Sequence, residues 1–319
     1  MTSNDTANRP GRVLVTGGAG FIGSHIVDAL VADGYEVSVV DNLHTGRREN
    51  VNPSARFHHV DIRDRLALSA VFETEHPQFI CHQAALANVR DSVEHPEEYA
   101  MVNVIGTLHL LELARAHRVR KFVMASTGGA IYGDAAKVPT DEDSIAHPLD
   151  PYGVSKLSGE HYLFSYRHNH GLDYCALRYG NVYGPRQDTR GEAGVVAIFS
   201  GRMLGGERAT INGDGRQERD FTYVGDVARA NLLALRQGSG IYNIGTGAPT
   251  DINTLFERLA ELADYRQPAA HGSHMLGEVR ASCLDPARAQ RDLGWKAEVP
   301  LAAGLASTLA WYRERMPAA

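Results

Sequence analysis

Tyr152 and Lys156 stand four residues apart in the segment DPYGVSKLSGEHY, which runs from Asp150 to Tyr162. Residues i and i+4 of a helix lie on one face, one turn apart. Pro151 suits the first turn of a helix because it has no N–H group to leave unsatisfied. The spacing therefore predicts a phenol and an ammonium that point the same way near the start of a helix. A solvent-exposed Tyr and Lys could share this spacing, so the rest of the chain must decide.

A glycine-rich loop, VTGGAGFIG, separates the first predicted strand from the first predicted helix. Gly17, Gly20 and Gly23 are spaced three apart, and Gly18 completes a GxGxxG pattern. Glycine permits a tight turn here, a close approach of the backbone to a pyrophosphate, and close packing of helix on strand. Glycines occur in many ordinary turns, but a loop that follows a strand and opens a helix predicts a dinucleotide-binding site.

Asp41 follows the second predicted strand, 18 residues after Gly23. An acid at this place can accept hydrogen bonds from the adenosine ribose and would repel the 2′-phosphate of NADP. This favours NAD as the cofactor, although the nearby Arg47 and Arg48 would suit NADP.

The ends of the third and fourth predicted strands also belong to the expected site. A doubly wound sheet binds its ligand at the carboxyl ends of its strands. The residues at these ends are Asp61 and Ile62, then the small Ala84 and Ala85, which would let a cofactor approach. His82 lies in an apolar strand, which is more typical of a core histidine than of a catalyst.

Tyr152 and Lys156 are expected to lie beside the cofactor and a third polar group. MASTGGAIYG ends the fifth predicted strand with Ser126 and Thr127, so a hydroxyl, a phenol and an ammonium are expected beside a nicotinamide. A free Tyr has a pKa of about 10 and is a poor base at neutral pH. The charges of Lys156 and of an oxidised nicotinamide both favour the phenolate. Tyr152 is therefore predicted to act as a general base on a substrate hydroxyl.

The elements that position these residues are β-branched runs alternating with helical stretches over the first two-thirds of the chain. The runs are continuously apolar, which is typical of a parallel sheet covered on both faces. We expect an α/β fold with a doubly wound parallel sheet (Rossmann) and a smaller C-terminal α/β substrate-binding lobe. The expected ranges are a flexible tail at 1–11, an NAD-binding domain at 12–182 to which the chain returns around 216–245, and the lobe at 183–319.

The composition excludes several classes of protein. The chain has 319 residues and a net charge of −6, which implies no nucleic-acid or anionic-membrane partner. No apolar run approaches the ~20 residues of a membrane span, and the polar N-terminus lacks the apolar core of a signal peptide. Cys81, Cys175 and Cys283 form no CxxC pair and no metal-ligand cluster. We expect free thiols, no metal, and a reducing cytoplasmic compartment.

A series of motifs from about Arg12 to about Trp295 resembles the extended short-chain dehydrogenase/reductase family, and within it the UDP-glucose 4-epimerase group. The motifs are, in order, VTGGAGFIGSH, DN at 41–42, VDIRD, HQAA, VNVIGT, STGGAIYGD, PYGVSK, LRYGNVYGPRQ, GDGRQERDFTYVGDVA, YNIGTG and LDPARAQRDLGW. They are specific for nucleotide-sugar-modifying members and separate the subfamilies less well.

The resemblance implies an NAD-dependent isomerase that inverts C4 of a UDP-hexose. Tyr152 takes the proton of the C4 hydroxyl while C4 gives hydride to bound NAD⁺, and hydride returns to the opposite face of the 4-keto sugar. Lys156 lowers the pKa of Tyr152 and holds the nicotinamide ribose. The family's usual hydroxyl falls at Gly128 here, so Ser126 or Thr127, with Thr127 preferred, would bind the substrate oxygen.

Further binding residues follow from the same resemblance. The cofactor contacts would also include Phe21, Ile22, Asn42, Asn103 and Tyr179. The substrate contacts would be Asn181 and Arg219 at the diphosphate, Val195 and Val196 along the sugar–nucleotide cleft, and Ser282 as a small gate residue that admits an N-acetyl group. Met275 stands where the group carries a second phosphate-binding Arg, so we expect weaker diphosphate binding or a substitute such as Arg280. A homodimer through helices near 97–117 and 152–170 is also implied.

Other activities fit the same motifs. A UDP-glucuronate 4-epimerase or decarboxylase, or another enzyme that modifies nucleotide sugars, would share them. A 4,6-dehydratase needs an Asp-Glu pair where this chain has Gly128 and Gly129. A non-catalytic NAD-sensing regulator is a distant alternative, and the intact Tyr152 and Lys156 argue against it.

Overall fold

The computed structural model describes residues 10–189, 194–273 and 279–315. These residues form two compact units, each made of three stretches of chain. The first unit contains residues 10–126, 150–177 and 228–242, and the second contains 127–149, 178–227 and 243–315. Each unit has its own hydrophobic core.

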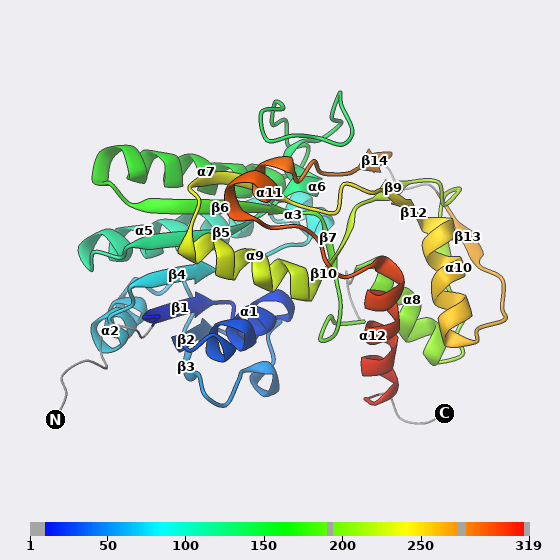
Figure 1. Ribbon diagram of the computed structural model, residues 1–319, viewed down its shortest axis with the longest axis horizontal. Helices are drawn as coiled ribbons and strands as arrows, with labels where there is room; N and C mark the ends of the chain where they lie inside the picture. The colour runs from blue at the N-terminus through cyan, green and yellow to red at the C-terminus, as the bar shows by residue number, and fades with distance from the viewer. Residues whose placement is uncertain (1–9, 190–193, 274–278, 316–319) are drawn as a thin grey trace. The chain divides into compact units, whose positions relative to one another are not determined.

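The first unit is built on a seven-stranded sheet in the order β11-β6-β5-β4-β1-β2-β3, most of which can be followed strand by strand in Figure 1. The strands from β3 to β5 pair in parallel. The predicted doubly wound sheet is confirmed. Its strands are β1 (Arg12–Thr16), β2 (Glu36–Asp41), β3 (Arg56–His59), β4 (Phe79–His82), β5 (Lys121–Thr127), β6 (Asp173–Tyr179) and β11 (Gly240–Ile244).

The order of the strands reverses at β1, which pairs with β2 on one side and with β4 on the other. Ligands of such sheets bind at the carboxyl ends of the strands where the order reverses. The turns that follow β1 and β4 are therefore the place in the first unit where a ligand is expected to bind. The glycine loop and Ala84 lie in these two turns.

The core of the first unit joins one face of the sheet to three helices. Leu14, Ile80 and Phe122 of the sheet are buried with Phe72 of α2 and Leu110 of α5. The same cluster reaches α7. The helices of this unit are α1 (Phe21–Ala32), α2 (Arg65–Glu75), α3 (Val89–Glu94), α4 (Pro96–Tyr99), α5 (Gly106–Ala116), α7 (Pro151–His170) and most of α9 (Val224–Arg236).

The helix predicted near 97–117 contains an irregular turn. A π turn (Ala100–Ile105) connects α4 to α5, and it carries Asn103. Such turns are rare and occur often at functional sites. The sequence analysis predicted a regular helix here and did not identify this turn.

His82 is a buried core residue, as the sequence predicted. Its Nδ1 lies 2.7 Å from Thr16 Oγ1 and its Nε2 lies 2.9 Å from Thr107 Oγ1. Because Thr107 Oγ1 donates to Asn103 O, it must accept from His82, which places the ring proton on Nε2. Burial lowers the pKa of His82 to about 3, so the ring is neutral. Ala84 N donates to Thr16 Oγ1, and a directed chain of hydrogen bonds thus joins β4 to the π turn.

The second unit packs α8, α10 and α12 around its own core, as Figure 1 shows. Its strands have only two or three residues each, too few for a periodic pattern, and the sequence analysis missed most of them. The elements are α6 (Gly128–Ile131), β7 (Asn181–Tyr183), α8 (Val195–Leu204), β8 (Thr210–Asn212), β9 (Glu218–Arg219), β10 (Phe221–Tyr223), β12 (Thr250–Asp251), α10 (Ile252–Ala263), β13 (Ala270–Gly272), β14 (Ala281–Ser282), α11 (Ala287–Leu293) and α12 (Leu301–Arg313).

The apolar residues between Asp173 and Gly184 predict a single strand, and this prediction was wrong. The run DYCALRYGNVYG forms two strands, β6 and β7, with Gly180 between them. Asn181 of β7 pairs with Phe221 of β10 instead of continuing the large sheet. The change of partner occurs where the chain passes from the first unit into the second.

Among the described residues, no helix has the length and apolarity needed to cross a membrane. The described residues also contain no group of three His, Cys, Asp or Glu side chains that could hold a metal ion. All three cysteines are buried and free, as expected.

Candidate functional site

The glycine loop of the first unit has room only for glycine at two positions. Gly17 has a φ of +69°, and a Cβ there would lie 2.6 Å from Ala84 N. A Cβ on Gly23 would lie 2.0 Å from Gly17 O. Gly20 precedes α1, whose first turn receives no hydrogen bond from a capping side chain. The loop therefore offers uncovered backbone N–H groups at a helix start, which fits the pyrophosphate of a dinucleotide.

Asp41 holds the glycine loop in shape. Its Oδ2 accepts from Ala19 N at 2.9 Å and its Oδ1 accepts from Leu43 N at 2.8 Å. Each oxygen keeps a further lone pair, which suits the hydroxyls of a ribose. Arg48, which the sequence analysis weighed in favour of NADP, lies over the ring of Phe57 at 4.5 Å.

Asp61 and Asn42 contact each other after β3 and β2. Asn42 Nδ2 donates to Asp61 Oδ2 at 2.8 Å, and Arg63 binds the same carboxylate through two nitrogens. The hydrogen bonds from Arg63 hold the pKa of Asp61 well below its usual range. Ile62 is a core residue on which Gly106 of α5 packs so closely that a Cβ there would lie 2.6 Å from Ile62 Cδ1.

The Asn103 side chain joins three segments of the first unit. Its Oδ1 accepts from Leu86 N, and its Nδ2 donates to Leu86 O and to Ser155 Oγ, each at 2.9 Å. Both amide protons are therefore used inside the protein. The predicted cofactor contact of Asn103 would have to use its remaining acceptor lone pair or its backbone.

Helix α7 places the predicted base and its lysine one turn apart on the same element. Asp150 caps the helix by accepting from Gly153 N at 2.8 Å, and Pro151 follows as the first helical residue. Tyr152 is half-buried, whereas Lys156 is buried and donates from Nζ to Ala125 O at 3.0 Å. Burial lowers the pKa of Lys156 to about 8.

The two candidate hydroxyls make different hydrogen bonds. Ser126 Oγ donates to Glu160 Oε1 at 2.6 Å, and both side chains are buried. Thr127 belongs to the second unit, where its Oγ1 accepts from Ala130 N at 3.3 Å and caps α6. The proton of Ser126 is thus committed to Glu160, whereas Thr127 can still donate its own proton to a substrate oxygen.

In the second unit, two predicted substrate residues lie on neighbouring strands. Arg219 of β9 pairs with Ser282 of β14, and the position of a Cβ on Gly129 is 3.9 Å from Ser282 Oγ. Asn181 on β7 is exposed, and Tyr179 at the end of β6 is buried.

Val195 and Val196 form the first turn of α8, after Gly194, and no side chain caps this helix. Val196 is 1% exposed and belongs to the core of the second unit. The side chain of Val196 therefore packs inside the second unit.

Asp220, next to Arg219, fastens three motifs of the second unit together. Its buried carboxylate accepts from Thr246 N at 2.8 Å, Thr246 Oγ1 at 2.6 Å, Gly247 N at 3.2 Å and Leu284 N at 3.2 Å. The segments around residues 219, 246 and 284 are thus held by one side chain.

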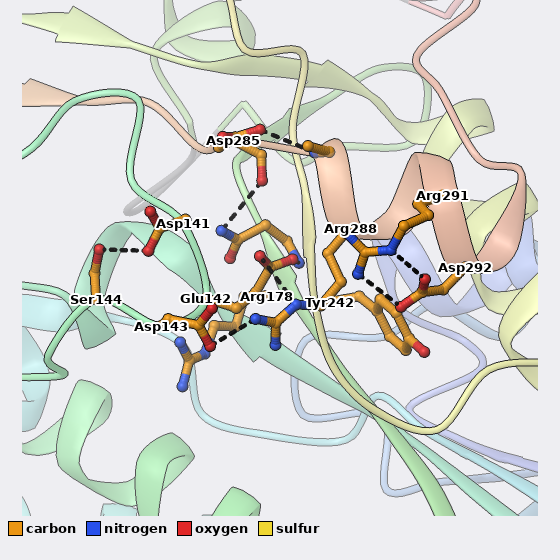
Figure 2. Close-up of polar contacts among 12 residues, drawn as sticks. Asp141, Glu142, Asp143, Ser144, Arg178, Tyr242, Asp285, Arg288, Arg291 and Asp292 are labelled. Carbon is orange, nitrogen blue, oxygen red and sulfur yellow. Dashed lines mark hydrogen bonds and ion pairs between the residues drawn. The ribbon is translucent and has the colours of Figure 1, made fainter.

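A second polar network anchors the segment that begins with Thr127. Arg178 Nη1 donates to Tyr132 Oη at 2.8 Å, and Tyr132 Oη donates to Asn243 Oδ1 at 2.9 Å. Asn243 N donates to Glu142 Oε1 at 2.8 Å. Arg288 pairs with Glu142 at 3.6 Å and with the neighbouring Asp143 at 2.6 Å, as Figure 2 shows.

Gly128 stands where the resembled family carries its hydroxyl, and the packing explains the glycine. A Cβ on Gly128 would lie 2.4 Å from Leu284 Cδ2 and 2.5 Å from Leu284 Cδ1. Leu284 is itself fixed through its backbone to Asp220. A serine at 128 therefore cannot fit unless Leu284 moves.

Met275 lies outside the described residues. Arg280, its expected substitute, binds the carboxylate of Asp214 through two nitrogens, at 2.9 and 3.2 Å.

Three residues of the site were missed by the sequence analysis: Glu160, Asp220 and Leu284. Only Glu160 carried a readable signal, because it stands one helical turn after Lys156 on the face that carries Tyr152.

Residues 13–245 match the model of a family described as "NAD dependent epimerase/dehydratase family". A putative UDP-glucose 4-epimerase from Methanocaldococcus jannaschii is 46% identical over 301 residues, which cover 94% of this chain and 98% of the relative.

Two crystal structures are similar over nearly the whole chain. A UDP-glucose 4-epimerase from Thermotoga maritima, solved with UDP-glucose, is 49% identical with a TM-score of 0.94, covering 95% of this chain and 99% of its own. A UDP-glucose 4-epimerase from Thermus thermophilus, solved in complex with NAD, is 45% identical with a TM-score of 0.91, covering 96% and 100%.

The packing of Gly128 on Leu284 can be tested with a double-mutant cycle. Gly128→Ser should destabilise the protein by about 1–3 kcal/mol, because the new side chain overpacks against Leu284. In the Leu284→Ala background the same change should cost clearly less, with a coupling of about 0.5–3 kcal/mol measured by denaturant unfolding. Gly129→Ser is the matched control, since its neighbour lies 3.9 Å away, and it should cost little. Additive costs in the cycle would contradict the packing argument.

Proposed function

The chain belongs to the NAD dependent epimerase/dehydratase family, and on that premise we propose that it inverts C4 of a UDP-hexose, interconverting UDP-glucose and UDP-galactose through a 4-keto sugar. The observation that carries this proposal is the arrangement on α7. It combines a half-buried Tyr152 with a buried Lys156 one turn away, in the unit that holds the glycine loop. The names of the similar proteins support the same substrate class.

The residues of the first unit would bind the cofactor and move the proton. The loop at Gly17, Gly20 and Gly23 would bind the pyrophosphate, and Asp41 the adenosine ribose. Bound NAD⁺ supplies a hydride acceptor for C4 and later returns the hydride. Tyr152 removes the proton from the C4 hydroxyl as a phenolate and gives it back when the sugar is reduced on its other face. Protonated Lys156 favours the phenolate.

We assign the hydroxyl that binds the substrate oxygen to Thr127. Its Oγ1 accepts a backbone N–H, so its proton can be donated to the oxygen at C4. Ser126 donates to Glu160 instead and has a supporting role. In the second unit, Arg219 and Asn181 would bind the diphosphate, and the uncapped start of α8 at Val195 and Val196 would offer it backbone N–H groups.

The general-base role is tested by Tyr152→Phe, which keeps the ring and removes the proton acceptor. We expect kcat for UDP-galactose epimerisation to fall by about 10²- to 10⁴-fold, while NAD stays bound to the purified protein. Tyr162→Phe changes a second tyrosine of α7 and is the matched control. Near-normal turnover of the Tyr152→Phe enzyme would rule out the proposed base.

The substrate itself is identified by incubating the wild-type protein with a panel of UDP-sugars and separating the products by chromatography. Conversion of UDP-glucuronate alone would replace the proposed substrate with the acidic one, and loss of carbon dioxide would indicate a decarboxylase. No conversion of any sugar would favour the non-catalytic regulator.

The small side chain of Ser282 should leave room for an N-acetyl group at C2 of the sugar. We therefore expect both the plain and the N-acetylated UDP-hexose pairs to be interconverted. Ser282→Tyr should lower kcat/KM for the N-acetylated pair far more than for the plain pair, because a steric block acts on one substrate only. Ser54→Tyr, at an exposed serine of the first unit, is the control. Equal losses on both pairs, or none, would remove Ser282 as the gate.

We also propose that the protein is a homodimer that works in the cytoplasm, where its buried thiols stay reduced. Apolar side chains are exposed on α7 and on the two elements that contact it, α3 and the π turn. They are Val89, Val93, Met101, Val154 and Phe164. A second copy of the chain would cover them.

The dimer is tested by light scattering after size-exclusion chromatography. The wild type should have the mass of two chains, and Phe164→Glu should shift it toward one chain, since a buried, unpaired charge opposes association. Leu66→Glu introduces the same charge at an apolar residue of α2 that is 85% exposed, and it should leave the dimer intact. A monomeric wild type would refute the proposal.

A further inference from the structure

Glu160 is a buried carboxylate for which the mechanism above has no role. Its side chain is 2% exposed, and it lies on α7 one turn after Lys156. A buried charge is costly unless it is paired and hydrogen-bonded. Its short hydrogen bond from Ser126 Oγ, at 2.6 Å, is typical of a bond to an ionised acceptor.

Two successive residues near the end of β5 bind the two buried charged side chains of α7. The carbonyl oxygen of Ala125 accepts from Lys156 Nζ at 3.0 Å, and the hydroxyl of Ser126 donates to Glu160 at 2.6 Å. The strand thus binds the cation through its backbone and the anion through a side chain. These two hydrogen bonds fix the charged groups of Lys156 and Glu160 against β5, on the same helix that carries Tyr152.

We propose that Glu160, held by Ser126, is a positioning residue that keeps Lys156 protonated and thereby sustains Tyr152 as the base. The inference rests on the proposed function, because it concerns the same site. It goes beyond that function in assigning a task to Glu160 and to the hydroxyl of Ser126.

Two titratable side chains near Lys156 and Glu160, those of His82 and Tyr174, carry no charge that could replace Glu160. Burial and the positive charge of Lys156 together lower the pKa of His82 on β4 to about 3. Burial raises the pKa of Tyr174 on β6, and the negative charge of Glu160 also raises it. Both are therefore neutral near pH 7. Burial lowers the pKa of Lys156 to about 8, and the negative charge of Glu160 opposes this fall.

The pH profile of kcat/KM tests the proposal. Glu160→Gln removes the negative charge and keeps the shape, so Lys156 should lose its proton more readily. The alkaline limb of the profile should move down by about one pH unit. Glu75→Gln removes another buried carboxylate, on α2, and should lower stability without moving this limb. Ser126→Ala keeps the charge and should shift the limb less than Glu160→Gln. An unmoved alkaline limb in Glu160→Gln would overturn the proposal.

A second measurement needs neither substrate nor activity. Lys156 has a lower pKa in the folded chain than in the unfolded one, so its contribution to stability grows as pH rises from about 8 toward 10 and is lost as pH falls back. In Glu160→Gln this growth should begin about one pH unit lower. In a Lys156→Met background, Glu160→Gln should produce no such shift, and an equal shift there would refute the pairing.

The two measurements separate the two claims. If no UDP-sugar is converted and the stability profile still shifts, the proposed function fails and the pairing of Glu160 with Lys156 stands. If sugars are converted and neither profile shifts, the proposed function stands and the role of Glu160 fails.

Discussion

The buried ammonium of Lys156 is the charge around which the polar interior of the first unit is arranged. A cation taken out of water needs an acceptor and a negative charge close by. Here Ala125 O accepts the hydrogen bond of Lys156, and Glu160 supplies the negative charge. The cation also disfavours a second positive charge, which adds to the burial that keeps His82 neutral. A neutral His82 can then accept from Thr16 and donate to Thr107, and that chain leads to the π turn and Asn103. One desolvated charge thus influences hydrogen bonds on β4, β5, α7 and the π turn.

The second unit also buries a charge, of the opposite sign. Asp220 is buried, and the donors to its carboxylate described above are backbone N–H groups and a hydroxyl. Backbone donors fix the chain itself, so Asp220 holds the strand-end turns around Arg219, Thr246 and Leu284 in one arrangement. In the proposed mechanism the charge of Lys156 acts on Tyr152, whereas the carboxylate of Asp220 holds the surrounding backbone in place.

The sequence predicted the parts of this molecule whose patterns are long or whose residues are special. Continuous apolar strands, Gly17 and Gly23 in their turn, and the pair Tyr152 and Lys156 were all readable, because each depends on local geometry. The sequence also identified His82 as a core residue, from its apolar strand. The strands of the second unit were too short to show a period, and the π turn was not identified from the sequence.

Contacts between distant segments were not readable either. The fit of Gly128 against Leu284 and the hydrogen bond of Ser126 to Glu160 join residues far apart in the chain, and no spacing rule links them. The sequence could favour Thr127 over Ser126 only through the resemblance, and it gave no physical reason for that preference. The choice turns on which hydroxyl already donates its proton inside the protein.

The division of the chain between the two units has a consequence for its synthesis. The first unit takes its last stretch from residues 228–242, and the edge strand β11 begins only at Gly240. A ribosome must therefore release most of the polypeptide before the large sheet receives its seventh strand. Until then the free side of β6 presents unpaired backbone groups, which are a template for pairing with another chain. The nascent protein thus carries an open edge on β6 until Gly240–Ile244 has been synthesised, long after the glycine loop and α7 have emerged.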